Sequence, residues 1–550
     1  MPREYFTDFP VCGTIKELIL DGFARGGEKR QFLFRDAEGV EQEKRFCDVA
    51  EDTSAIAAFL RSRGIGAGSK VAILSENCYF WNVVFYAIQC NGSIAVPLEP
   101  GLPAEDIAAQ MTHCACEAVF FSEAQAEKVA YAKELPDCTL AGCFSMANPA
   151  LLIAAGEEAS PEAKRASAEA PVKPEDLACI VYTSGTTGKT KGVMLTHKNI
   201  CSNVYSLLHI ATGGHGIGFL PLNHTYSWVT GLFATLVKTE WGYICTSLRR
   251  IYKDIKEYQP TQFAAVPMVV EMIYQNIILT AKRNGTYDKL MQGVATSRNF
   301  MLSGYDARRE IFADIHEKLG GKLECIFCGG AYLSPEIEEF MYDIGIQIRT
   351  GYGLTECSPI VTCARRYEYK FGSTGLPLEC CEIKIHEPDE DGIGEIYVRG
   401  DNVMAGYYND PETTAEAFDG EWLKTGDYGW IDDEGYLWFT GRKKNLIVLS
   451  NGKNVSPEII EGKLVSAVHY IKEALVYEKD NRICAEVFLD ETEEPDAREL
   501  LPTDIKAVNA TLADFMQIGT FVVRDTEFPK TATLKIKRNY DKQAQPAVSG

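Results

Sequence analysis

Apolar residues recur along the N-terminal part of the chain in two alternating periods, one helical and one strand-like. Apolar positions three and four residues apart predict helices, and short apolar runs between polar residues predict strands. The elements predicted in this way are helices at 14–23, 49–63 and 80–90 and strands at 31–35, 70–74, 93–96 and 118–121. Because helices and strands alternate over short connections, we expect an α/β domain with a mainly parallel sheet.

The pattern resumes after residues 154–174, where many Ala, Glu, Pro and Ser residues predict a solvated connector. The segment 263–278 predicts a strand, a proline turn and a helix, and 432–435 predicts a hairpin turn. Further strands are predicted at 177–182, 193–196, 323–327, 346–349 and 394–400, and a helix at 198–210. We expect 406–408 to continue the strand at 394–400.

Composition bounds the number of domains and the kind of partner. A chain of 550 residues is too long for one hydrophobic core, so several domains are expected. Asp and Glu (77) outnumber Lys and Arg (55), which gives a formal net charge of −22. This excess argues against nucleic acid as the main partner, because nucleic acid attracts basic surfaces. Any basic site must therefore be local.

The chain has 18 cysteines, and they are scattered rather than spaced as metal ligands. Cys325 and Cys328 lie in an apolar run, so we expect them in a core strand. Residues 1–10 lack the features of a secretory leader, which favours a reduced, cytoplasmic protein. No apolar run is long enough to predict a membrane span. Peripheral membrane contact stays open, although no basic amphipathic anchor supports it.

Residues 182–192 read Y-T-S-G-T-T-G-K-T-K-G and have the composition of a phosphate-binding loop. Glycines let the backbone approach a ligand, while hydroxyl and lysine side chains bind phosphate oxygens. The residues concerned are Thr183, Ser184, Gly185, Thr186, Thr187, Gly188, Lys189, Lys191 and Gly192. The order differs from the G-x-x-x-x-G-K-[ST] P-loop. We predict a polyphosphate cradle between two strands.

Two later motifs carry residue types that suit a nucleotide. In G-Y-G-L-T-E at 351–356, Tyr352 offers a ring for stacking on a purine and Glu356 offers an oxygen ligand for Mg²⁺. Thr355 can hydrogen-bond to the α-phosphate. In K-T-G-D at 424–427, the Asp427 carboxylate can accept both hydroxyls of a ribose.

In this order the motifs resemble those of the adenylate-forming superfamily, which contains acyl-CoA synthetases, peptide-synthetase adenylation domains and beetle luciferases. The resemblance covers nearly the whole chain and implies ATP, Mg²⁺ and CoA as ligands. It assigns the metal to Glu356 and Thr183. It assigns ATP to Thr183, Ser184, Gly185, Thr186, Thr187, Gly188, Lys191, Gly329, Gly330, Ala331, Tyr352, Gly353, Thr355, Asp427 and Arg442.

The resemblance also implies a division of the chain. G-R-K-K-N at 441–445 is similar to the family's hinge, with Lys444 as the pivot. We therefore expect an adenylation domain at 1–442, a mobile C-terminal domain at 443–540 and a tail at 541–550. The expected fold is α/β, with mainly parallel sheets and a β-barrel-like part in the large multi-subdomain N-terminal domain. The small C-terminal domain is expected to be α+β.

Residues of the C-terminal domain are expected to act in both half-reactions. P-K-T-A-T-L-K at 529–535 resembles the family pattern whose last lysine, Lys535 here, bridges the carboxylate and the α-phosphate. Gly452 is assigned to the CoA path. Lys537 and Arg538 are interpreted as a basic tail patch. Three positions depart from the common pattern, namely Thr190, Asn445 and Leu534.

The acyl pocket is assigned from L-P-L-N-H-T-Y at 220–226. By resemblance His224 lies near the reacting carboxylate, where it is assigned a catalytic role, and Trp228 gates the acyl tunnel. A histidine that caps a strand end and a tryptophan in plain core packing remain alternatives. V-P-M-V-V-E-M-I-Y at 266–274 is similar to long-chain acyl-CoA synthetases.

The expected activity is the conversion of a medium- or long-chain fatty acid to acyl-AMP with release of pyrophosphate, followed by transfer to CoA. Alternatives are a ligase that loads a carrier protein and a nucleotide-binding pseudoenzyme. Amino-acid activation is disfavoured, because residues 223–226 lack an acidic side chain for an ammonium group. Chain length, an aromatic acid and a homodimer stay open.

Overall fold

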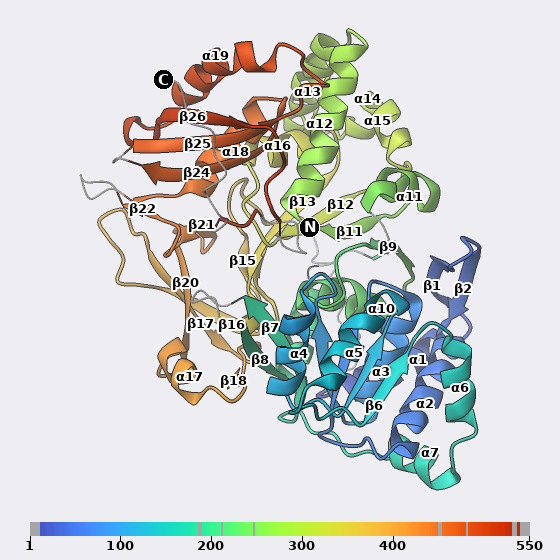
Figure 1. Ribbon diagram of the computed structural model, residues 1–550. Coiled ribbons are helices and arrows are strands. Elements are labelled where there is room, and N and C mark those ends of the chain that lie inside the picture. Colours follow the sequence, from blue (N-terminus) through green and yellow to red (C-terminus); the bar gives the residue numbers. More distant parts are fainter. Residues whose placement is uncertain are drawn as a thin grey trace.

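The computed structural model describes residues 11–184, 190–208, 210, 213–245, 248–448, 454–479, 482–530 and 536–538. Figure 1 shows the N-terminal elements at the lower right and the C-terminal elements at the upper left, with the sheets of the middle of the chain between them. The chain therefore forms a large N-terminal part built on several sheets and a small C-terminal part, as expected for this mixed α/β protein.

The largest sheet has seven strands in the order β18-β8-β7-β4-β3-β5-β6. Its central strands are parallel, whereas β8 pairs antiparallel with both β7 and β18. The strand bounds are β3 Lys70–Leu74, β4 Ile94–Leu98, β5 Ala118–Phe121, β6 Gly142–Ser145, β7 Leu177–Ser184, β8 Thr190–Thr196 and β18 Gly406–Tyr407. The predicted strands at 70–74 and 118–121 are confirmed without change.

Helices cover both faces of this sheet, which is why its strands are almost continuously apolar. One face packs against α1, α2, α3 and α8, and the other packs against α4 and α5. Their bounds are α1 Ile15–Gly26, α2 Phe46–Ser62, α3 Tyr79–Cys90, α4 Ala104–His113, α5 Ala126–Glu134 and α8 His197–Leu208. Thr14 caps α1 by accepting a hydrogen bond from the Glu17 backbone N–H.

The predicted connector at 154–174 is wrong, because two helices cover most of it. They are α6 (Pro149–Glu157) and α7 (Pro161–Ala168), and both lie along α2 (Figure 1). Each begins with proline in its first turn, a position where proline is well tolerated. Gly156 lies so close to α2 that a Cβ would stand 1.9 Å from the Ala55 carbonyl oxygen. Small residues therefore allow close helix packing here.

A second, mixed sheet has the order β11-β12-β13-β14-β15, with β11, β12 and β13 parallel. Its strands are β11 Gln262–Ala265, β12 Cys325–Gly329, β13 Gln347–Gly353, β14 Ile360–Cys363 and β15 Leu376–Pro377. A separate apolar core joins it to α11 Ile251–Tyr258, α12 Pro267–Arg283, α13 Tyr287–Leu302 and α16 Pro335–Asp343. Cys325 and Cys328 are buried in β12, which confirms the core-strand interpretation.

Two further sheets flank this region. A four-stranded sheet has the order β2-β1-β10-β9, with bounds β1 Arg30–Arg35, β2 Glu41–Arg45, β9 Gly216–Gly218 and β10 Gly242–Ile244. An antiparallel sheet contains β16 Cys381–His386, β17 Gly394–Gly400, β19 Phe418–Asp419, β20 Trp422–Ile431 and β21 Leu437–Arg442.

The antiparallel sheet departs from expectation in two respects. Its described strands form an open path, β16-β17-β20-β19 with β21 on β20, rather than a closed barrel. Residues 406–408 do not continue β17, since β18 pairs with β8 in the seven-stranded sheet. The strands β20 and β21 do form the predicted hairpin around residues 432–435. The chain therefore leaves the antiparallel sheet after β17, adds β18 to the edge of the seven-stranded sheet and returns at β19.

The C-terminal part has its own apolar core. Its sheet has the order β24-β25-β26, and the short strands β22 and β23 precede it. The bounds are β22 Ile447–Val448, β23 Asn454–Val455, α18 Pro457–Ala467, β24 Ile471–Lys479, β25 Arg482–Leu489, α19 Ala497–Asn509 and β26 Ile518–Arg524. Contacts with the larger part include an ion pair between Lys463 and Glu336 at 3.4 Å.

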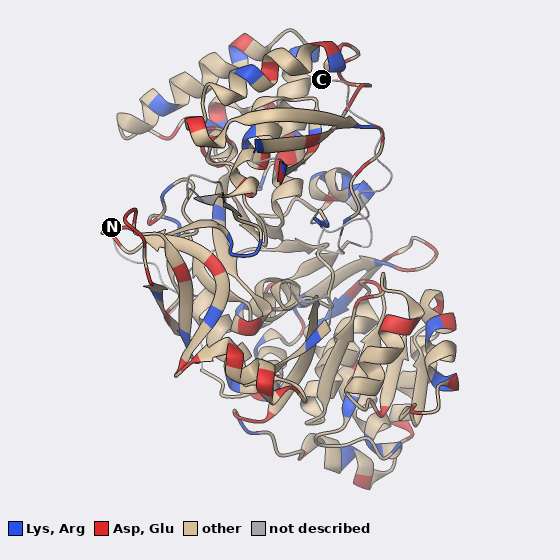
Figure 2. Cartoon of the chain, turned by 60° about the vertical axis from the view of Figure 1, so that its left-hand side comes forward, with Lys and Arg blue, Asp and Glu red and all other residues tan. Residues whose placement is uncertain are grey.

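Charged residues of both signs are interspersed over the helices and strands of the molecule (Figure 2). None of the 18 cysteines, all of which lie in the described part of the chain, forms a disulfide. Within the ranges given above, the helices are too short or too polar to cross a bilayer.

Candidate active site

Three residues predicted to bind a nucleotide meet where the mixed sheet approaches the antiparallel sheet. Tyr352 lies on β13, while Asp427 on β20 stands opposite Arg442 on β21. The Tyr352 hydroxyl donates to Asp427 Oδ2 at 2.8 Å, and Arg442 Nε lies 3.3 Å from Asp427 Oδ1. Burial, and then the Asp427 carboxylate, raise the pKa of Tyr352, so the phenol stays protonated and keeps donating. Asp427 is therefore an oriented and nearly buried carboxylate.

Glycines form the ends of the strands beside this cluster. Gly329 stands opposite Gly351 in the parallel pairing of β12 and β13, and Gly330 has φ +91°. A Cβ at Gly353 would lie 2.0 Å from the Pro359 carbonyl oxygen, so that position has no room for a side chain. Tyr226 donates to the Phe327 carbonyl at 3.0 Å and fixes the end of β12. Gly330 and Ala331, which follow β12, are exposed, whereas Gly329 is buried beneath Tyr226.

A tyrosine links Glu356 to the predicted phosphate cradle. The Tyr407 hydroxyl donates to Glu356 Oε1 at 3.0 Å, and Lys191 Nζ lies 4.8 Å from the centre of the Tyr407 ring. Burial and the Glu356 charge raise the pKa of Tyr407. Tyr407 reaches this place because β18 pairs with β8, which carries Lys191. Sequence motifs assign Tyr407 no role in the site and predict only that 406–408 continues a strand.

Glu356 suits a metal that arrives with phosphate oxygens. It lies in a short 3₁₀ turn, Thr355–Cys357, and is only partly exposed. In the described part of the chain, no group of three or more His, Cys, Asp or Glu side chains could hold a metal ion by itself. Mg²⁺ commonly takes one or two protein carboxylates and completes its octahedron with water and substrate phosphates. A single oriented carboxylate beside the cradle fits that requirement.

Several predicted site residues lie outside the described residues. They are Gly185, Thr186, Thr187, Gly188, Lys189, Gly452 and Lys535. The side chain of Ser184 also lies outside the described part. The strands on either side of the cradle are described, and Thr183 pairs with Lys191 across them. The structure thus gives the two ends of the cradle, while its tip stays a prediction.

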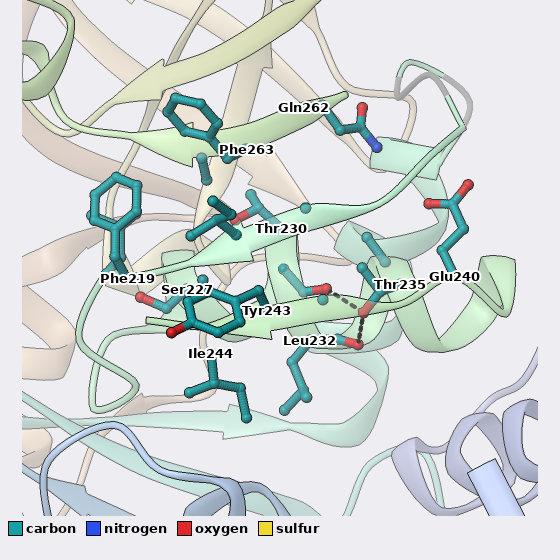
Figure 3. A pocket seen from close by; sticks show the side chains of 18 of the residues that line it. Phe219, Ser227, Thr230, Leu232, Thr235, Glu240, Tyr243, Ile244, Gln262 and Phe263 are labelled. Carbon is teal, nitrogen blue, oxygen red and sulfur yellow. Dashed lines mark hydrogen bonds between the residues drawn. The ribbon is translucent and has the colours of Figure 1, made fainter. Parts of the chain in front are cut away.

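A largely apolar cavity of about 110 Å³ lies between the strands β9, β10 and β11 and the helical segment 225–238 (Figure 3). That segment comprises α9 (Thr225–Ser227), a π-helical turn η2 (Trp228–Phe233) and α10 (Ala234–Lys238). Apolar lining residues include Phe219, Leu232, Tyr243, Ile244 and Phe263. Glycines at 216, 218, 231 and 242 also line the cavity and leave room in its wall. Phe327, two residues before Gly329 on β12, connects the cavity to the cluster described above.

The two residues predicted to line the acyl pocket stand beside this cavity and are not among the residues that form its wall. Trp228 is fully buried, with Phe85 at 5.2 Å and Phe233 at 6.0 Å between ring centres. His224 precedes α9 and donates its backbone N–H to the Pro221 carbonyl. Their neighbours Leu222 and Ser227 do line the cavity.

Asn77 is a residue that sequence reasoning missed. It donates to the Leu220 carbonyl at 2.8 Å and accepts from the Leu222 N–H at 2.9 Å. These two bonds fix the turn that leads to His224, and Asn77 also lines the cavity. It follows β3 by three residues, so only the topology brings it to this turn.

The predicted hinge lies at the end of β21. Lys444 is exposed, and partial desolvation of its ammonium group, followed by the Arg442 charge, lowers its pKa. Lys443 forms an ion pair with Glu395 at 3.0 Å, and its backbone N–H donates to the Gly426 carbonyl. Asn445 donates to Glu458 Oε1 of α18 at 2.9 Å. Lys443 therefore contacts the larger part, and Asn445 contacts the C-terminal part.

Comparison with protein families gives a match over residues 24–408 to the family described as AMP-binding enzyme. Among curated proteins, the chain is similar to the peroxisomal long chain acyl-CoA synthetase 7 of Arabidopsis thaliana, at 29% identity over 83% of this chain and 70% of the relative. It is also similar to the long-chain-fatty-acid–CoA ligase FadD15 of Mycobacterium bovis, at 26% identity over 91% of this chain and 90% of the relative.

Among solved structures, the adenylation domain of a carboxylate reductase from Mycobacterium chelonae superposes with a TM-score of 0.79. The alignment covers 96% of this chain and 89% of that domain at 22% sequence identity. At this identity the likeness shows a shared fold.

Proposed function

Because this chain belongs to the AMP-binding enzyme family, we propose that it is an AMP-forming acid–thiol ligase that acts on a medium- or long-chain fatty acid. It forms an acyl-adenylate from the acid and ATP with release of pyrophosphate, and it then transfers the acyl group to the thiol of CoA. The apolar cavity that reaches Phe327, beside the Tyr352–Asp427–Arg442 cluster, is the observation that carries this proposal.

The nucleotide is held by the residues that the fold gathers around β12, β13 and β20. Asp427 accepts the ribose hydroxyls, and Tyr352 and Arg442 keep its carboxylate in place. The adenine lies on the backbone of Gly329, Gly330 and Ala331 against the Tyr352 ring. Thr355 and the cradle from Thr183 to Lys191 bind the phosphates.

The acid binds with its chain in the cavity and its carboxylate at the end nearest β12. That carboxylate attacks the α-phosphorus of ATP, and the bond to the pyrophosphate leaving group breaks. Lys535 neutralises charge on the carboxylate and the α-phosphate as this happens. Glu356 and Thr183 would hold Mg²⁺, which would supply charge neutralisation for the phosphates. Positioning of the two anions contributes most of the remaining rate.

In the second half-reaction the CoA thiol attacks the acyl carbonyl, and AMP leaves. We propose that the C-terminal domain from residue 443 onward rotates about Lys444 between the two steps, which removes Lys535 from the site and admits CoA beside Gly452. The contacts of Lys443 and Asn445 with different parts of the chain support a pivot at this place.

The proposal is tested with purified protein, ATP, Mg²⁺ and a panel of short, medium, long and aromatic acids, while pyrophosphate release and CoA-thiol loss are followed together. We expect both signals to rise with one class of fatty acid. Pyrophosphate release without thiol loss would select a carrier protein as the acceptor. Nucleotide binding with neither signal would contradict the proposal and favour a pseudoenzyme.

Cavity size can be changed at Gly231, where a Cβ would meet no atom within 4 Å. Because Gly231 lines the cavity, the Gly231→Leu side chain is expected to occupy space used by the acyl chain. An overfilled apolar site costs about 1–3 kcal/mol, so we expect kcat/KM for the longest accepted acid to fall roughly tenfold.

The shortest accepted acid should be affected much less, and Gly231→Ala should give an intermediate result. The measurement is kcat/KM across the acid panel for the three proteins. A uniform loss at every chain length would show that the acyl chain does not pass Gly231.

We also propose a cytoplasmic location, peripheral membrane contact and a homodimer for this protein. The relative from Arabidopsis thaliana is named as peroxisomal, so similarity alone does not give the location of this chain. Gel filtration of the purified protein tests the homodimer, and vesicle flotation tests the membrane contact.

A further inference from the structure

The two basic residues at the end of the described chain have different surroundings. Lys537 is exposed, whereas the Arg538 guanidinium lies among polar groups of α18 and β24. Its Nη2 is 2.6 Å from Glu461 Oε2 and 3.1 Å from Glu458 Oε1. Its Nη1 donates to the Val476 carbonyl at 3.2 Å. Arg538 is therefore part of a network, which corrects its interpretation as a surface patch.

The Glu461 carboxylate has the Arg538 guanidinium as its counter-charge. Its Oε1 accepts from the Val476 backbone N–H at 2.6 Å, and burial raises its pKa to about 7 while Arg538 opposes that rise. A buried carboxylate without a counter-charge is costly. Arg538 and Glu461 therefore hold each other against β24.

The neighbouring backbone is held at a second point. Lys530 and Ile536 form an antiparallel bridge, and the Lys537 N–H donates to the Pro529 carbonyl at 2.8 Å. The Lys530 ammonium group pairs with Glu473 of β24, and Glu473 Oε2 also accepts from the Phe528 N–H at 2.7 Å. The described residues on either side of 531–535, Lys530 and Ile536, are thus held to each other, and Lys530 is held to β24.

Glu458 ties the network to the predicted hinge. Its Oε1 accepts from Asn445 Nδ2 at 2.9 Å and lies near Arg538, while its Oε2 accepts from the Ser456 hydroxyl at 3.0 Å. One carboxylate therefore contacts a residue beside the pivot Lys444 and a residue three positions after Lys535.

We propose that Arg538 is a positioning residue for Lys535, and that Glu458 couples its position to the hinge through Asn445. The inference rests on the proposed function, because it assumes that Lys535 acts in adenylation. Arg538 does not touch the substrates. It anchors the segment that carries Lys535 to the C-terminal part, so that Lys535 arrives in the site in one orientation each time this part closes.

The test is Arg538→Met, which keeps an unbranched apolar side chain and removes the charge and hydrogen bonds of the guanidinium. A displacement of 1 Å in a catalytic group can cost about 10²-fold, and we expect a partial displacement to slow adenylation about tenfold. Adenylation is read as single-turnover pyrophosphate release. Thioester formation from preformed acyl-AMP and CoA should be largely retained, since Lys535 does not act there.

Lys537→Met is the matched control, because it removes the neighbouring positive charge from an exposed position, and it should leave both half-reactions unchanged. Arg538→Lys should restore part of the adenylation rate. Combining Arg538→Met with Asn445→Ala should give less than the product of the two single effects, because both residues act through Glu458.

Equal losses in both half-reactions, or a normal adenylation rate in Arg538→Met, would overturn the inference. A folding defect is recognised separately by thermal unfolding of each variant. If the unmodified protein releases no pyrophosphate with any acid, the proposed function fails before the role of Arg538 is reached, so the two failures are distinct.

Discussion

Replacing Lys535 with alanine is expected to slow adenylation by about 10²–10³-fold, the range measured when one group that stabilises developing charge is removed. The reaction brings a carboxylate to a phosphate, and a lysine between the two anions lowers the cost of that approach. Pyrophosphate release in a single turnover measures the effect. Thioester formation from preformed acyl-AMP is expected to continue, because the proposed rotation takes Lys535 out of the site before CoA enters.

Lys537→Ala provides the comparison, since it removes an exposed positive charge two residues away. Similar losses in Lys535→Ala and Lys537→Ala would indicate a general electrostatic effect of the tail. Equal losses of both half-reactions in Lys535→Ala alone would contradict the assignment of this lysine to adenylation.

Asp427→Asn is expected to weaken ATP binding about 10- to 100-fold, because a hydrogen bond to a charged group contributes about 1.5–3 kcal/mol. The amide keeps the size of the side chain but loses the charge and one acceptor oxygen. The Tyr352 hydroxyl and Arg442 would then compete for the remaining oxygen. Calorimetric titration with ATP measures the change without requiring turnover.

Asp433→Asn is the matched control, since Asp433 is exposed in the turn between β20 and β21. It should bind ATP as the unmodified protein does. If Asp427→Asn binds ATP normally, the ribose is held elsewhere, and the Tyr352–Asp427–Arg442 cluster has only a structural role.

Much of the fold could be predicted because local pattern and tertiary structure agree. The strands at 70–74 and 118–121 are flanked by helices on both faces, so their apolar runs are unambiguous. The prediction of a connector at 154–174 failed because the composition of this segment is typical of a linker, although it folds into helices. Proline opens both helices, at Pro149 and Pro161, and the packing of Gly156 on Ala55 has no local signature.

Within the site, residue types in local motifs predicted Tyr352 and Asp427, and the family resemblance added Arg442. The structure places both Tyr352 and Arg442 on the Asp427 carboxylate. Tyr407 and Asn77 were missed because their roles depend on partners far away in the sequence, Glu356 for one and the 220–222 turn for the other. Arg538 was misread for the same reason, since only the fold shows Glu458 and Glu461 beside it.

The pairing of β18 with β8 has a consequence for the order in which the chain is synthesised. Residues of β18 leave the ribosome roughly 200 positions after those of β8, a delay of about 10–40 s at 5–20 residues per second. During that interval the outer edge of β8 lacks its partner strand. Unpaired strand edges are templates for association with other chains. We therefore expect truncations that end before residue 406 to aggregate, and chaperones that cover strand edges to raise the yield of the full-length protein.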